Sequence, residues 1–139
     1  MLHQIIYTSA ALPSVTLHDF EDITRHASQN NRALDVTGIL LFSDGVVFQV
    51  LEGEKDVVQA LYDRIKDDQR HSSVVLMISR EAATREFPSW SMGSTKMSPD
   101  HVSELGFLLT KDSLSKALPP EPTTELRVLS QTFARVNGL

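Results

Sequence analysis

Five polar residues of this sequence could form one binding site: Tyr7, Asn31, Gln49, Arg64 and Asp68. A phenol, two amides, a guanidinium and a carboxylate together supply both hydrogen-bond donors and acceptors. Gln49 is the most informative of them, because it lies in an otherwise apolar stretch where an amide without partners would destabilise the fold. A planar ligand with donors and acceptors along its edges would satisfy all five groups.

The stretch around Gln49 has the pattern of a β-hairpin. Two apolar runs flank Asp44-Gly45, a dipeptide typical of a two-residue hairpin turn. That turn pairs Leu40 with Gln49 and Leu41 with Phe48, so the first pair shares one face and the second pair shares the other. Both faces are mainly apolar, which predicts a central hairpin covered on both sides.

Two helices are expected to enclose the site on one face of the sheet. The first begins near Thr16, a plausible N-cap, and its apolar stripe ends at Asn31. The second covers residues 54–67, directly after the hairpin. Ile23 of the first helix and Ile65 of the second could hold a planar ligand between them. The second helix is expected to turn Val57, Leu61 and Ile65 inward, with Arg64 and Asp68 on an adjoining edge.

The order of the elements predicts the fold class. Strands are expected over residues 2–9, which contain Tyr7, over 72–79, and at a sheet edge over 90–96. Strand, helix, hairpin, helix, strand is the ferredoxin-like βαββαβ arrangement of the α+β class, here with a fifth strand. Two C-terminal helices, around 105–109 and 126–136, are expected to cover the face of the sheet that the first two leave bare.

Composition and motifs exclude several classes of function. A chain of 139 residues suits one domain, and its net charge of −5 without a basic block argues against nucleic-acid binding. There are no cysteines, and the five histidines lack metal-ligand spacing, so no metal site is expected. We find no nucleophile elbow or phosphate loop and expect no enzymatic activity. Because no membrane-length apolar run or signal peptide is present, we expect a cytoplasmic protein.

Four stretches together resemble the BLUF domain, a blue-light sensor that uses flavin adenine dinucleotide (FAD). They are IIYTS (5–9), NNRALDVTGILLFSDGVVFQVLEG (30–53), DRIKDDQRH (63–71) and REFPSWSMG (85–93). The resemblance covers residues 1–97 and leaves 98–139 as a helical extension of the same compact unit. It implies that Tyr7, Gln49, Trp90 and Met92 are the photoactive residues. The implied flavin contacts are Tyr7, Ile23, Asn30, Asn31, Leu40, Phe48, Gln49, Arg64, Ile65, Asp68, His71 and Met92.

The resemblance also implies a mechanism. Light excites the flavin, Tyr7 donates an electron and a proton, and Gln49 changes orientation or tautomer, which shifts the flavin absorption to the red. Trp90 or Met92 then moves, and the edge strand and C-terminal helices relay the change to a partner protein or an oligomer. FMN or riboflavin could replace FAD. The alternatives are a ferredoxin-like ligand-binding or protein-interaction module without photochemistry and, more remotely, an acyl-phosphate hydrolase, whose Arg-bearing phosphate loop is missing.

Overall fold

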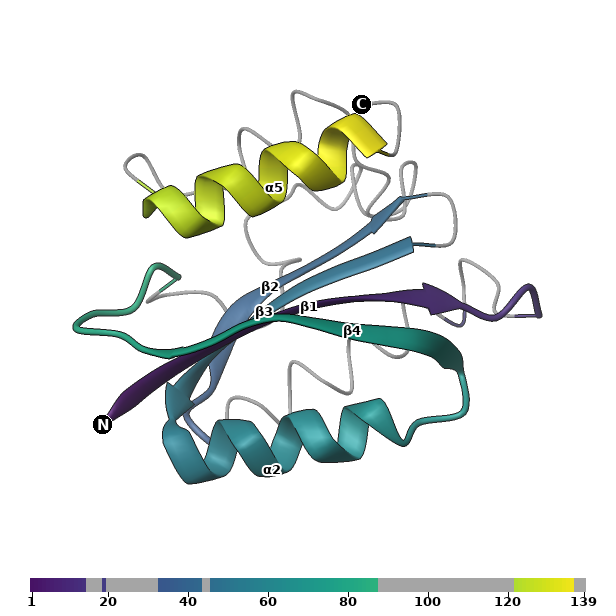
Figure 1. Cartoon of the computed structure of the whole chain (residues 1–139). Helices are drawn as coiled ribbons and strands as arrows, with labels where there is room; N and C mark the ends of the chain where they lie inside the picture. Colours follow the sequence, from purple (N-terminus) through teal and green to yellow (C-terminus); the bar gives the residue numbers. More distant parts are fainter. Residues whose placement is uncertain (15–18, 20–32, 44–45, 88–121, 137–139) are drawn as a thin grey trace.

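The computed structural model describes residues 1–14, 19, 33–43, 46–87 and 122–136. A four-stranded antiparallel sheet with strand order β2-β3-β1-β4 lies at its centre (Figure 1). The described elements are β1 (Leu2–Ala11), β2 (Thr37–Ser43), β3 (Val46–Glu54), α2 (Lys55–Lys66), β4 (His71–Glu81) and α5 (Thr124–Val136).

The hairpin forms with the predicted register. Leu40 of β2 pairs with Gln49 of β3, and Leu41 pairs with Phe48. β1 lies on the other side of β3, antiparallel to it, and places Tyr7 directly opposite Gln49. β3 is therefore an inner strand, and eight of its nine residues are wholly or partly buried. Its apolar side chains on both faces are explained by layers on both sides.

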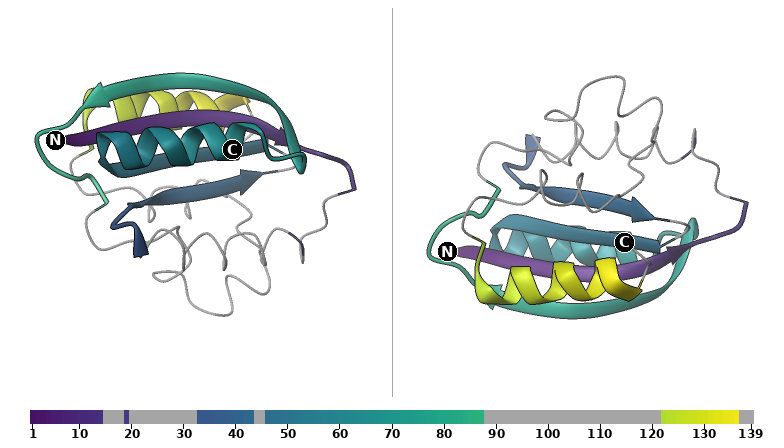
Figure 2. Two further views of the ribbon diagram at one scale, coloured as in Figure 1. Left: turned by 90° about the horizontal axis from the view of Figure 1, so that it is seen from below. Right: turned by 90° about the horizontal axis from the view of Figure 1, so that it is seen from above.

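Helices cover the two faces of the sheet, α2 one face and α5 the other (Figures 1 and 2). Each face has its own apolar cluster because successive side chains of a strand point to opposite sides. The α2-side cluster contains Ile5, Tyr7, Val36, Leu40, Val47, Leu51, Val58, Leu61 and Tyr62. The α5-side cluster contains Ile6, Ile39, Phe48, Val50, Phe87 and Leu126. The expected cover on both faces and the ferredoxin-like α+β class are confirmed.

Helix α2 is rotated relative to the sequence prediction. Leu61 is buried as expected, but its buried neighbours are Val58 and Tyr62, whereas Val57 and Ile65 are only partly buried. The prediction weighed aliphatic residues alone, and the structure buries the larger Tyr62 ring against β1 instead. Because each helical residue advances by about 100°, Val58 and Tyr62 lie to one side of Leu61, and the buried face is centred on that side.

Several predicted elements lie outside the described residues. These are most of the helix from Thr16 to Asn31, the turn at Asp44-Gly45, the edge strand over 90–96 and the helix around 105–109. In the described part of the chain, neither helix is long and apolar enough to cross a membrane.

We expect Leu126→Ala to destabilise the protein by about 2–5 kcal/mol, because it removes a buried aliphatic side chain and leaves a cavity. Leu126 is 0% exposed and packs in the α5-side cluster. Val128, in the same helix, is 51% exposed, so Val128→Ala is the matched control, with an expected change within about 0.5 kcal/mol. Urea unfolding of both variants measures the difference. Equal effects would contradict the packing of α5 on the sheet.

Candidate functional site

Tyr7 and Gln49 meet in the interior of the protein on the α2 side of the sheet. They occupy opposed positions of β1 and β3, and their side chains share a face. Tyr7 is 2% exposed and Gln49 is 3% exposed. The Tyr7 hydroxyl donates a hydrogen bond to Oε1 of Gln49. The buried amide thus has the polar partner that the sequence required, and that partner is the neighbouring phenol.

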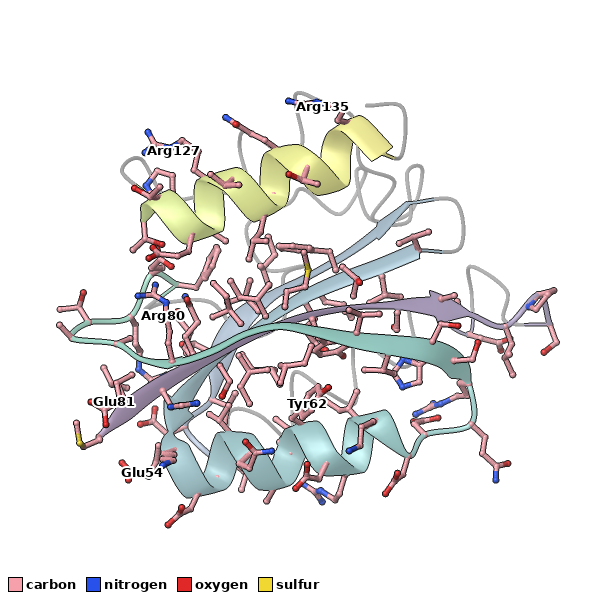
Figure 3. The ribbon with its side chains drawn as sticks, in the orientation of Figure 1. Glu54, Tyr62, Arg80, Glu81, Arg127 and Arg135 are labelled. Atoms are coloured by element: carbon pink, nitrogen blue, oxygen red, sulfur yellow. The ribbon has the colours of Figure 1, made fainter. Side chains whose placement is uncertain are left out.

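The surroundings of this pair are mainly apolar and aromatic. The Tyr7 ring packs against the ring of Tyr62, with centroids 5.5 Å apart and planes tilted by 59°. Tyr62 points from α2 toward the sheet (Figure 3). The sequence reasoning missed Tyr62, although its position four residues after Val58 is a signal for a shared helix face.

Burial determines the charge of Tyr7. Removal from water strongly raises the pKa of its hydroxyl, and the neighbouring Tyr62 and Asp68 raise it further. A phenolate in this position would be an uncompensated buried negative charge. Tyr7 is therefore a neutral phenol with its proton directed at Gln49.

The raised pKa predicts that native Tyr7 does not ionise at the ordinary value for tyrosine of about 10. The chain has two tyrosines, so Tyr7 is the only one left in a Tyr62→Phe variant. The pKa of Tyr7 is higher in the folded protein than in the unfolded chain. Tyr7 therefore makes its full stabilising contribution to folding below pH about 10. This contribution is lost as the pH rises from there toward the folded pKa. We expect tyrosinate absorbance to appear only as the protein unfolds. The urea-unfolded variant is the control and should titrate near pH 10; a native midpoint near 10 would contradict the burial.

His71 ties the end of α2 to β1. Its Nε2 donates to the carbonyl oxygen of Ile65 at 2.5 Å, since a carbonyl can only accept. Nδ1 is hydrogen-bonded to the hydroxyl of Ser9 at 2.8 Å, and in the neutral ring with its proton on Nε2 it accepts that bond. Ser9 is buried two residues after Tyr7 and lies on the same face of the strand. His71 thus lies on the predicted side of the sheet, at the edge of the Tyr7–Gln49 region.

Asp68 lies beyond the end of α2 and is bound by a residue that the sequence reasoning missed. Its Oδ2 accepts from a terminal nitrogen of Arg70 at 2.6 Å, and its Oδ1 accepts from Nε at 3.0 Å and from the backbone N–H at 2.9 Å. The Arg70 hydrogen bonds lower the pKa of the Asp68 carboxyl, which is an anion at neutral pH. Arg64 is exposed. In the sequence, the two-residue spacing between Asp68 and Arg70 is the signal that could have predicted this ion pair.

The structure places three further predicted contact residues. Leu40 is buried beside Gln49 in the α2-side cluster, and Ile65 is partly buried against it. Phe48 is the exception, because its ring is fully buried in the α5-side cluster. Neighbouring residues of a strand point to opposite faces, so Phe48 faces away from the Tyr7–Gln49 pair, and its predicted flavin contact is not compatible with a ligand beside that pair. Ile23, Asn30, Asn31, Trp90 and Met92 lie outside the described residues.

The described residues include no group of three or more His, Cys, Asp or Glu residues that could hold a metal ion. The polar groups gathered near Tyr7 are instead a phenol, an amide, an imidazole and a carboxylate–guanidinium pair. This donor and acceptor set suits an organic ligand with polar edges.

Comparison with known proteins decides the family. The family model of BLUF, described as sensors of blue light using FAD, matches residues 2–93 of the 139-residue chain. The chain belongs to the BLUF family. BLUF domains use flavin and sense blue light, so this chain is a blue-light sensor module and the resemblance seen in the sequence is confirmed.

Curated relatives carry the BLUF region within much longer chains. The chain is 35% identical over 94 residues to photoactivated adenylate cyclase subunit beta of Euglena longa, covering 67% of this chain and 11% of that protein. It is 36% identical over 87 residues to the blue light- and temperature-regulated antirepressor BluF of Escherichia coli, covering 63% of this chain and 22% of that protein. The chain thus spans 11% and 22% of the lengths of these two relatives.

Solved BLUF structures have the same fold. The dark state of BlrB, a BLUF protein, has a TM-score of 0.67 at 26% identity, covering 97% of this chain and 96% of BlrB. Klebsiella pneumoniae BlrP1 with FMN and cyclic diGMP has a TM-score of 0.72 at 30% identity, covering 96% of this chain and 35% of BlrP1.

Proposed function

We propose that Tyr7 and Gln49 are the light-responsive pair of this BLUF sensor and that a flavin binds beside them on the α2 side of the sheet. The observation that carries the proposal is their buried hydrogen bond, formed from opposed positions of the two inner strands. A phenol in contact with an amide, both deeply buried on one face, combines a proton donor with a group whose hydrogen bonding can be reversed.

The residues around the pair fit a flavin ring. The ring is planar and apolar on its faces, and its edge carries both donors and acceptors. Leu40 and Ile65 supply apolar surface, Gln49 supplies donor and acceptor, and Asp68 and His71 supply polar groups near the end of α2. The remaining proposed contacts follow from the family pattern. They are Ile23, Asn30, Asn31, Arg64 and Met92.

When bound, the flavin supplies the absorption of blue light and an acceptor for an electron. Tyr7, as a neutral phenol, is the proposed donor of that electron and of the proton on its hydroxyl oxygen. Burial stabilises the neutral form, and the hydrogen bond directs the proton toward Oε1 of Gln49.

The amide of Gln49 has two nearly isosteric orientations. In the observed orientation Oε1 accepts from Tyr7. Rotation of the amide by about 180° would place Nε2 at that position, so that the Tyr7 oxygen would accept instead of donate. The exchange reverses the direction of a hydrogen bond with little change in packing, which is the property of a two-state element. Trp90 and Met92 are the proposed next residues in the response.

We propose FAD as the cofactor, following the description of the family, with FMN as a possible substitute because it occurs in a BlrP1 complex. The sensor is proposed to lack enzymatic activity, since no catalytic motif appears in its sequence. Its output would then pass to a separate partner protein or through an oligomer. Residues 98–139 are proposed to relay it, as an extension of the flavin-binding part, residues 1–97.

Absorption spectroscopy tests the proposal. We expect the purified protein to be yellow, to shift its flavin absorption to the red under blue light, and to recover in darkness. Chromatography of the flavin released by heat identifies FAD, FMN or riboflavin. A protein that takes up no flavin after incubation with excess FAD, or a flavin-loaded protein without a light-dependent shift, would contradict the proposal and favour the module without photochemistry.

A further inference from the structure

A second buried glutamine, Gln4, lies in β1 three residues before Tyr7 and is 0% exposed. Its Nε2 donates to Oε2 of Glu52 at 3.0 Å and to Oε2 of Glu86 at 2.7 Å. Its Oε1 accepts from Nε of Arg80 at 3.0 Å. A rotated amide would direct its oxygen at two carboxylates and its hydrogens at a guanidinium, so Gln4 has only one favourable orientation.

Glu52 holds the chain after β4 against β3. Its carboxylate is 1% exposed and accepts hydrogen bonds from the backbone N–H groups of Glu86 at 3.0 Å and Phe87 at 2.8 Å. Burial raises the pKa of this carboxyl, and the hydrogen bonds from Glu86, Phe87 and Gln4 oppose the rise. Residues 86 and 87 are thereby attached to the strand that carries Gln49.

Glu86 continues this network to the start of α5. Its Oε1 accepts from the backbone N–H of Thr123 at 2.6 Å, and its Oε2 accepts from the Thr123 hydroxyl at 3.2 Å. The Thr123 oxygen in turn accepts from the N–H of Leu126 at 3.3 Å, which is the N-cap contact of α5. Arg80 forms an ion pair with Glu86 at 3.6 Å, and Figure 3 shows it between the sheet and α5.

We propose that Glu86 is the positioning residue that fastens the N-terminal end of α5 to the sheet, and that light-induced displacement reaches α5 through it. The apolar contacts of Leu126 and Leu129 are non-directional, whereas the Glu86–Thr123 hydrogen bonds require a defined geometry. Glu86 also lies four residues before Trp90 and six before Met92 in the sequence, next to the segment proposed to respond first. The light-dependent part of this inference rests on the proposed function; the attachment itself does not.

Hydrogen exchange in Glu86→Gln tests the attachment in the dark. The substitution keeps the shape of the side chain but exchanges one acceptor oxygen for an NH₂ group, which faces the donors of Gln4 or Thr123. Deuterium uptake by residues 122–136 should become about tenfold faster or more, with the sheet unchanged. Glu125→Gln, the same change at an exposed position of the same helix, is the control and should exchange like wild type. Unchanged uptake in α5, or equal acceleration throughout the sheet, would overturn the proposal.

Thr123 provides a second pair of variants if Glu86→Gln does not fold. Thr123→Val removes the hydroxyl that contacts Glu86 and caps Leu126, and should accelerate exchange in α5 alone. Thr123→Ser keeps the hydroxyl and should exchange like wild type. Wild-type exchange in Thr123→Val would overturn the attachment.

The same exchange experiment under blue light tests the relay. We expect wild type to show a light-dependent change in residues 122–136, and Glu86→Gln to lose that change while keeping the red shift. A red shift accompanied by an undiminished light-dependent change in Glu86→Gln would overturn the relay. Absence of a red shift in flavin-loaded wild type would contradict the proposed function instead, and the dark comparison would still decide the attachment.

Discussion

Tyr7→Phe should bind flavin and show no light-induced red shift. The substitution removes one oxygen and keeps the ring that packs against Tyr62, so the α2-side cluster is preserved. A phenyl ring has no proton to transfer and gives up an electron far less readily than a phenol. Loss of the hydroxyl also removes the donor to Oε1 of Gln49, which should cost about 1–3 kcal/mol of stability. Spectra before and after illumination measure the shift, and urea unfolding measures the cost.

Tyr62→Phe is the matched control for this prediction. It removes the hydroxyl of the chain's other tyrosine and also keeps the ring. We expect the red shift to persist, because the hydrogen bond to Gln49 comes from Tyr7. A normal shift in Tyr7→Phe would remove Tyr7 from the role of donor. Loss of the shift in both variants would show that the response depends on each hydroxyl and would not single out Tyr7 as the donor.

Gln49→Leu should also bind flavin without shifting its absorption. Leucine is similar to glutamine in volume but has neither donor nor acceptor, so no hydrogen bond is left to reverse. The Tyr7 hydroxyl would lose its acceptor inside the protein, at a cost of about 1–3 kcal/mol. The difference spectrum between light and dark is the measurement, on protein loaded with FAD to the same ratio as wild type.

Gln59→Leu is the control for the amide. Gln59 is exposed on α2 and donates to Asp63 at 3.1 Å, so the same substitution there removes an amide far from the pair. Its spectrum should shift as in wild type. If Gln49→Leu shifted normally, the switching amide would have to be sought elsewhere in the chain.

The two buried glutamines differ in a way that explains why only Gln49 is proposed to switch. Gln4 is surrounded by two carboxylates and a guanidinium, whose charges accept only one orientation of the amide. Tyr7, which bonds to Gln49, differs from these charged partners of Gln4. Its hydroxyl can donate to the oxygen of Gln49 or accept from its nitrogen. Tyr7 can therefore keep a hydrogen bond to Gln49 in either orientation of the amide.

The sequence alone determined the local features of the site. Asp44-Gly45 and the flanking alternation were sufficient to predict the register that pairs Leu40 with Gln49 and separates the two faces of β3. The misplaced amide in an apolar strand was sufficient to predict a buried partner. Both inferences rest on residues close together in the chain, where turn chemistry and strand periodicity are decisive.

Only the tertiary structure decided which distant residues meet. Tyr7 is the partner of Gln49 because β1 pairs with β3 across 42 positions of sequence, and Gln4 reaches Glu86 across 82. Tyr62 is a core residue because α2 packs its ring against Tyr7 of β1. Phe48 lies on the opposite face of β3, as the alternation predicts, and is buried there in the cluster that includes Leu126 of α5. The repeat of apolar residues in a strand or helix predicts the face of that element on which a side chain lies. Which elements then lie against that side is decided by packing between elements, because the free energy of burial depends on the assembled layers.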